Sequence, residues 1–114
     1  MTPERSEKLQ RTALEVKDKM FQRIAEVKDI HECFDTASVI GITLDNSQGL
    51  WVELGYAYKA QEILEAMKRR LMEFSPISNG SSVAYQIALT LLNAQIKEFH
   101  HLQQERMSKD ASLN

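Results

Sequence analysis

Apolar residues recur along most of the chain at intervals of three and four positions, the spacing that places them on one face of an α-helix. The first such stretch covers residues 3–28, and charged residues occupy its opposite face. Thr2 can cap this helix, and Pro3 suits its first position because the N–H that proline lacks would have no partner there. The apolar face consists of Leu9, Ala13, Val16, Met20, Ile24 and Val27.

A shorter stretch with the same period covers residues 29–40, which can either continue the first helix or begin a second one. Because glycine is unfavourable inside a helix, we expect this stretch to end at Gly41. Residues 43–49 are rich in Asp, Asn and Ser, which form hydrogen bonds with their own backbone in turns, and they are predicted to form a loop.

Two longer helices are predicted in the second half of the chain, at residues 50–74 and 83–107. A loop at residues 75–82, which begins with a Ser-Pro pair, separates them. The last helix carries two adjacent apolar tracks, so one neighbouring helix cannot cover its whole apolar surface. The first track consists of Tyr85, Leu89, Leu92, Ile96 and Phe99, and the second of Ile87, Leu91 and Ala94.

These patterns predict an all-α fold of three long helices and one short helix. We expect a single bundle domain over residues 1–108, followed by a frayed polar tail at 109–114. The helices at 50–74 and 83–107 should form an antiparallel hairpin across the short loop between them. Three such helices make a rod that is too narrow to cover every apolar stripe, so the sequence also predicts a homodimer.

The composition narrows the class of protein. Apolar residues make up 43% and charged residues 26% of the 114 residues, as in ordinary globular domains. The net charge of −2 disfavours a nucleic-acid binder, which usually has a basic excess. The lone Cys33 excludes an internal disulfide. With no signal peptide at the N-terminus and no apolar run near the ~20 residues of a membrane span, we expect a cytoplasmic protein.

Few residues form a pattern that indicates chemistry. The chain has no phosphate-binding glycine motif and no nucleophile elbow, so we expect no enzyme and no cofactor. His31, Glu32 and Cys33 are three types of metal ligand, but neighbours on a helix point about 100° apart and cannot share one ion. We therefore expect no metal site.

A helix-turn-helix unit is the strongest alternative, at residues 33–54. Ala37, Gly41 and Leu50 match its small residue, turn glycine and apolar anchor. Two features weaken the match: Ser47 stands where an apolar anchor is needed, and residues 44–49 contain no Lys or Arg to contact phosphate. A DNA-binding regulator is thus the second hypothesis.

The leading hypothesis is a small non-enzymatic protein–protein interaction module, such as a regulator, adaptor, chaperone or inhibitor. It would act through helical surfaces that are more apolar than one chain can bury. Aromatic residues with a polar end are enriched at interfaces, although they can equally cap a core. The candidate interaction residues are Trp51, Tyr56 and Tyr58, together with the first track, Tyr85, Leu89, Leu92, Ile96 and Phe99.

Overall fold

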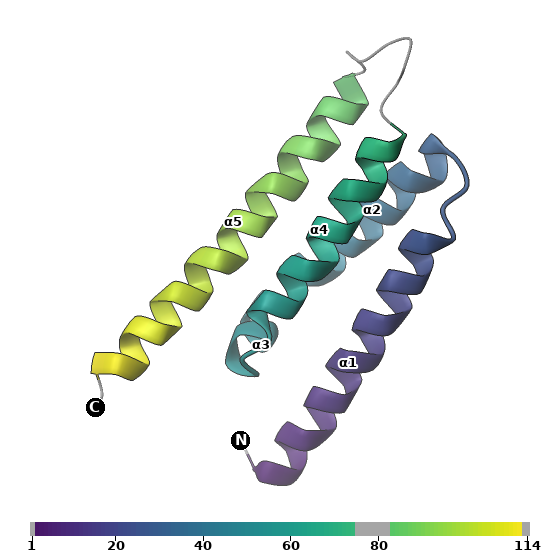
Figure 1. Ribbon diagram of the computed structural model, residues 1–114. Coiled ribbons are helices and arrows are strands. Elements are labelled where there is room, and N and C mark those ends of the chain that lie inside the picture. Colours follow the sequence, from purple (N-terminus) through teal and green to yellow (C-terminus); the bar gives the residue numbers. More distant parts are fainter. Residues whose placement is uncertain (1, 75–82, 113–114) are drawn as a thin grey trace.

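Five helices pack together in the computed structural model of the chain, which describes residues 2–74 and 83–112, and the short α3 (Gln48–Glu53) lies at one end of the bundle (Figure 1). The described residues contain no strand, so the predicted all-α class is confirmed for them. The predicted loop at 75–82 and the last two residues of the predicted tail lie outside the described residues. The helices are α1 (Pro3–Ala25), α2 (Ile30–Asn46), α3 (Gln48–Glu53), α4 (Ala57–Glu73) and α5 (Val83–Ser112).

The helix at the centre is α4, which packs against each of the other four. In the described part of the chain α1 and α4 run in one direction, and α2 and α5 run in the other (Figure 1). The buried side of α4 is a continuous apolar stripe at helical spacing, and it forms the middle of the core. This stripe consists of Ala57, Ala60, Ile63, Leu64, Met67 and Leu71.

Polar side chains connect the neighbours of α4 to it across the packed faces. The Nζ atom of Lys17 on α1 lies 2.6 Å from a carboxylate oxygen of Glu62. On the other side of α4, the Nε2 atom of Gln61 donates a hydrogen bond of 3.1 Å to the carbonyl oxygen of Ile96 on α5. These contacts add modestly to the apolar packing that positions α1 and α5 against α4.

The first two helical stretches are separate helices. Asp29 caps α2, since its side chain accepts a 2.9 Å hydrogen bond from the backbone N–H of Glu32. The Glu32 carboxylate in turn accepts a 2.8 Å bond from the N–H of Lys28. Together these bonds stabilise the start of a new helix, which decides between the two alternatives that the sequence leaves open.

The predicted end of the second helix at Gly41 and the loop at 43–49 are wrong. Helix α2 runs through Gly41 to Asn46, and the chain turns at Ser47 instead, where the hydroxyl group donates a 2.7 Å bond to the carbonyl oxygen of Thr43. A Cβ atom on residue 41 would lie 3.0 Å from the Oε1 atom of Gln95 on α5. The glycine therefore permits close packing inside a helix rather than ending it.

The prediction of one helix at residues 50–74 is also wrong, because the chain turns between α3 and α4. Gly55 has a φ of 78°, a conformation that favours glycine. The N–H of Tyr56 bonds the carbonyl oxygen of Trp51, and the N–H of Gly55 bonds that of Val52, at 2.8 and 3.0 Å. This is the Schellman pattern that ends helices, and it divides the predicted helix into a short and a long one.

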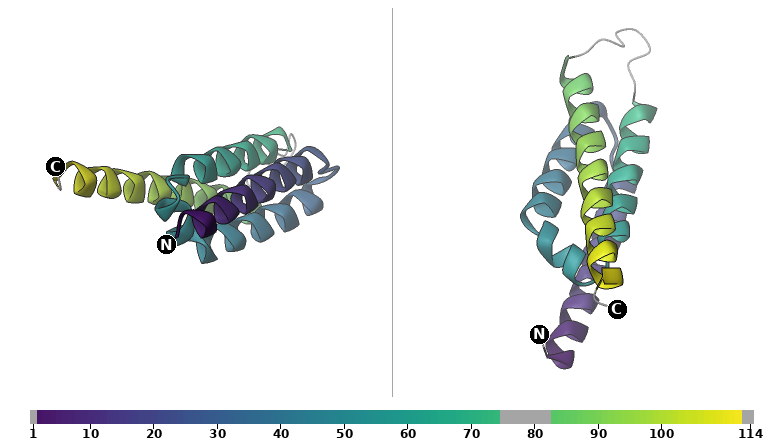
Figure 2. Two further views of the ribbon diagram at one scale, coloured as in Figure 1. Left: turned by 90° about the horizontal axis from the view of Figure 1, so that it is seen from below. Right: turned by 90° about the vertical axis from the view of Figure 1, so that its left-hand side faces the viewer.

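The molecule is elongated, with principal extents of 54 × 27 × 18 Å. The C-terminal part of α5 extends beyond the other helices (Figure 2). Near that end, the Nη1 atom of Arg106 donates a 2.7 Å bond to the carbonyl oxygen of Val52, which joins α5 to α3. Within the described residues, no helix combines the length and the apolar character that crossing a membrane requires.

Candidate interaction groove

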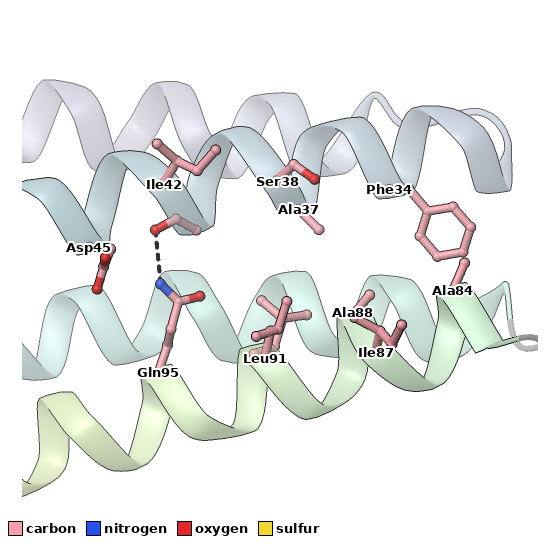
Figure 3. A pocket seen from close by; sticks show the side chains of 12 residues that line it. Phe34, Ala37, Ser38, Ile42, Asp45, Ala84, Ile87, Ala88, Leu91 and Gln95 are labelled. Atoms are coloured by element: carbon pink, nitrogen blue, oxygen red, sulfur yellow. Dashed lines mark hydrogen bonds between the residues drawn. The ribbon is translucent and has the colours of Figure 1, made fainter.

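A groove of about 690 Å³ lies between α2 and α5, whose side chains face each other across it (Figure 3). The α2 wall is built at helical spacing, because residues three, four and seven positions apart share one face. It consists of Phe34, Ala37, Ser38, Gly41, Ile42 and Asp45.

The α5 wall repeats this arrangement with small and aliphatic residues at the same spacing. Phe34 and Ala84 face each other at one end of the groove, and Asp45 and Gln95 lie at the other end (Figure 3). There the Nε2 atom of Gln95 donates a 2.8 Å hydrogen bond to the carbonyl oxygen of Gly41, which holds the two helices together. The α5 wall consists of Ala84, Ile87, Ala88, Leu91, Leu92 and Gln95.

Aliphatic side chains of both walls are open to solvent. Ile42 is 62% exposed, Ile87 54% and Leu91 59%. Single exposed apolar side chains are common on protein surfaces, but a contiguous apolar hollow is characteristic of a binding surface. These three residues, hereafter the apolar seat, line one cavity from two helices that are not adjacent in sequence.

Charge is distributed unevenly around the groove. Asp45 is the single ionisable residue among the described residues that line it. Helix α2 contains carboxylates but no Lys or Arg, and residues 83–96 of α5 contain no charged residue at all. The walls are therefore apolar along most of their length and negative at the Asp45 end.

The residues of the first α5 track lie inside the core. Tyr85, Leu92 and Phe99 are buried, and Leu89 and Ile96 are half-buried against the core. Their burial follows from packing within the single chain. In the second track Ile87, Leu91 and Ala94 are exposed, so the surface left for a partner is the second track rather than the first.

The aromatic candidates near α3 do not share one surface. Trp51 is buried, and its Nε1 atom donates a 3.0 Å hydrogen bond to the hydroxyl group of Ser47, which matches the role of a core cap. Tyr56 is half-buried and Tyr58 is exposed, and the Nζ atom of Lys59 lies 5.1 Å from each ring centroid. None of the three lines the groove.

The geometry of residues 33–54 gives little support to the helix-turn-helix alternative. Gly41, the expected turn glycine, lies inside α2. The helix after the turn, α3, has six residues, and its Trp51 faces the core. Neither α2 nor α3 contains a Lys or Arg that could contact phosphate.

The residues with metal-ligating side chains are also dispersed. Cys33 is fully buried, whereas the neighbouring His31 and Glu32 are exposed. Among the residues described, no three His, Cys, Asp or Glu side chains come together at a place that could hold a metal ion.

The pKa of the buried Cys33 thiol is shifted by the residues around it. Burial raises the pKa of its thiol above the ordinary value of 9.0, and the nearby Arg70 guanidinium partly opposes that effect. Arg70 also holds this corner of the fold, because its Nη2 atom donates a hydrogen bond to the carbonyl oxygen of Val27. The thiol is thus kept neutral and shielded at physiological pH.

A raised thiol pKa predicts a loss of stability in alkali. The unfolded chain ionises its thiol from about pH 9, whereas the folded chain holds the proton to higher pH, so the thiol's stabilising effect is complete below pH 9 and declines above it. The decline for a single proton cannot exceed about 1.4 kcal/mol per pH unit. Urea unfolding of the wild type and Cys33→Ala between pH 7 and 10.5 measures it. The stability difference between them should narrow above pH 9, and a constant difference would contradict the prediction.

Comparison with known proteins gives no match, whether to a protein family, a curated protein or a solved structure.

Proposed function

We propose that the protein is a non-enzymatic interaction module that holds a helix of a partner protein in the groove between α2 and α5. The observation that supports this proposal most directly is the solvent exposure of the apolar seat, Ile42, Ile87 and Leu91, within one cavity. Two parallel helices with an apolar hollow between them match the way in which grooves receive one face of an amphipathic helix.

Burial of the apolar seat would contribute part of the free energy of binding. Complete burial of an aliphatic side chain contributes about 1.5–3 kcal/mol. Each residue of the apolar seat is more than half exposed, so a partner that covers all three would gain roughly 3–5 kcal/mol from them. This gain is comparable to the lower estimates of the entropy cost of association, so further contacts along the walls must supply the net affinity.

The chemistry of the groove favours binding over catalysis. Among the described lining residues, Asp45 has the single ionisable side chain, and Gln95 and Ser38 are the other polar side chains of the walls. A nucleophilic hydroxyl is usually activated by a base within hydrogen-bond reach, whereas Ser38 and Asp45 lie seven residues apart on α2, or about 10 Å at 1.5 Å per residue. The walls instead form an apolar groove, which suits the binding of an apolar surface.

In the homodimer that the sequence predicts, the partner that occupies the groove would be a second copy of this chain. That prediction depended on one α5 track remaining uncovered, and the second track, with Ile87 and Leu91, has this property. A second copy of the chain and a different protein are thus two occupants of the same groove. A covalent trap at the groove can distinguish them by mass.

In the cells that produce the protein, a photo-reactive benzophenone side chain at position 91 should form one discrete adduct. Its mass identifies either a second copy or a different protein. The same side chain at Met72, which is 50% exposed on α4 and outside the groove, is the matched control and should form none. Ile87→Asp should abolish the adduct at position 91, since a carboxylate would then lie in the apolar seat. If position 91 gives no adduct, or gives the same products as position 72, the proposed function is wrong.

A further inference from the structure

We propose that the occupant of the groove is a basic amphipathic helix of a different protein. This inference rests on the proposed function and specifies its partner. Three features support it, namely the length of the walls, the placement of carboxylates at one end, and the poor fit of a second copy.

The walls determine the length of the bound segment. Phe34 to Asp45 on α2 and Ala84 to Gln95 on α5 each span eleven residue steps, or about 17 Å at 1.5 Å per residue. A helix of about three turns covers that distance. Its apolar side chains must recur at intervals of three and four positions to remain in contact with the apolar seat.

The charges determine which end of the bound segment carries basic residues. Asp45 lines one end of the groove, and Glu98 and Glu105 continue the line of Leu91 at intervals of seven residues along α5. Residues seven apart share one face of a helix, so these carboxylates extend the acidic end beyond the groove. Complementary charge requires Lys or Arg at the matching end of the partner helix.

The cations near this end lie beside Glu105, beyond the groove, or on other faces of α5; Lys109 follows Glu105 by four residues. Arg106 bonds the carbonyl oxygen of Val52 on α3, and Lys97 lies on another face of α5, one residue before Glu98. His101 pairs with Glu105 at 3.1 Å on the exposed surface, and this contact is ionic when the imidazole is protonated. The walls themselves contain no Lys or Arg.

A second copy of the chain that docks through its own α5 face fits this pattern poorly in either orientation. If two α5 faces pair in parallel, Glu98 meets the partner copy's Glu98, and like charges oppose each other. If they pair antiparallel about Leu91, Glu98 lies over the apolar end near Ala84, because both are seven residues from Leu91. A carboxylate is then desolvated without a partner, which is unfavourable. The charge pattern thus favours a different protein.

Binding of designed peptides to the purified full chain tests the inference. The probe is a fluorescein-labelled helical peptide of 18 residues, built from Leu, Ala and Lys. Its leucines recur every three or four positions over three turns, and its lysines lie at one end. One control peptide replaces every Lys with Glu and keeps the apolar stripe. A second control has the same composition as the probe, with the leucines distributed around the helix.

Fluorescence anisotropy at 50 mM salt should show saturable binding of the basic peptide and no binding of the control peptide whose leucines are distributed around the helix. The Lys-to-Glu peptide should bind at least about tenfold more weakly, because two or three ion pairs are replaced by repulsion. Asp45→Asn should weaken binding of the basic peptide about threefold, as expected for one exposed ion pair. Adding Glu98→Gln should weaken it further, and 500 mM salt should reduce the difference between wild type and variants.

The variant Leu91→Asp should lower the affinity at least about thirtyfold, as at a central interface residue, whereas Met72→Asp should leave it unchanged. Circular dichroism of both variants verifies that they fold. Equal binding of the basic and acidic peptides would overturn the inference, as would a position-91 adduct whose mass is that of two copies of this chain. In both cases the groove remains an interaction site and the proposed function stands. If no adduct forms at position 91, both the proposed function and the inference about its partner are wrong.

Discussion

Replacing Leu64 with aspartate is expected to abolish the folded state. Leu64 is fully buried on α4, and α4 packs against every other helix of the described chain. A carboxylate at this position would have no cationic partner within the apolar core cluster, so it must remain charged and desolvated or take up a proton. Changes of this kind cost about 3–5 kcal/mol or more, which is comparable to the whole stability of a marginal domain.

The measurement is far-UV circular dichroism during heating. The wild type should be dominated by helix and unfold cooperatively, whereas Leu64→Asp should express as insoluble protein or show no cooperative transition. Two controls isolate the cause. Leu64→Met keeps the volume and the apolar character and should cost less than about 1.5 kcal/mol. Glu65→Gln changes the neighbouring exposed residue and should alter stability by less than about 0.5 kcal/mol. A cooperative transition in Leu64→Asp at the wild-type temperature would show that this face is not the core.

Phe99→Ala is expected to leave a folded but much less stable protein. Phe99 is 1% exposed and is the last residue of α5 in the buried core. Removing a buried phenyl ring costs about 3–5 kcal/mol, since the contacts are lost and the cavity collapses only in part. At about 4 °C or more per kcal/mol for a domain of this size, the melting temperature should fall by roughly 12 °C or more.

The matched control for Phe99→Ala is the neighbouring His100→Ala, on the exposed face of α5. It should change the free energy of unfolding by less than about 0.5 kcal/mol. Urea denaturation of the three proteins gives the free energies, and equal slopes verify that the same surface is exposed on unfolding. A loss below 1 kcal/mol for Phe99→Ala would mean that α5 is not anchored at this residue.

Helical periodicity predicted where most core residues lie. Met20 and Ile24 on α1, and Leu64 and Met67 on α4, fall in the predicted stripes and are buried. On α5 the two apolar tracks were correctly recognised, but the sequence alone could not assign one to the core and the other to solvent. That assignment depends on which side of α5 faces α4, which is a property of the packing.

Glycine was the main source of error in the helix boundaries. Gly41 was expected to end a helix and lies inside one, while Gly55 was expected inside a helix and ends one. Local preference is the same for both residues, so it cannot distinguish them. At Gly41 the deciding contact is with Gln95, 54 residues away, and such contacts are not evident in a local pattern.

The groove was missed for a related reason. The sequence predicted a loop at residues 43–49, so the last turn of α2, which carries Asp45, was not recognised as helix. The position of Asp45 at the end of the groove could then not be predicted. The sequence did contain a usable signal, because an uncharged first half of α5 with more apolar surface than one neighbour can cover indicates a second contact. The α2 wall could not be predicted from the sequence, because that prediction requires knowing that α2 and α5 lie side by side.

The overhang of α5 affects how the protein moves through a solution or a porous matrix. A compact chain of 114 residues has a radius of gyration near 13 Å, whereas this chain has one of 15.8 Å, with extents of 54 × 27 × 18 Å. An elongated particle experiences more friction than a sphere of equal mass. A monomer would therefore elute early from a gel-filtration column calibrated with spherical standards, at a volume that imitates a dimer. The mass of 13.1 kDa must be measured by a method independent of shape, such as light scattering or sedimentation equilibrium.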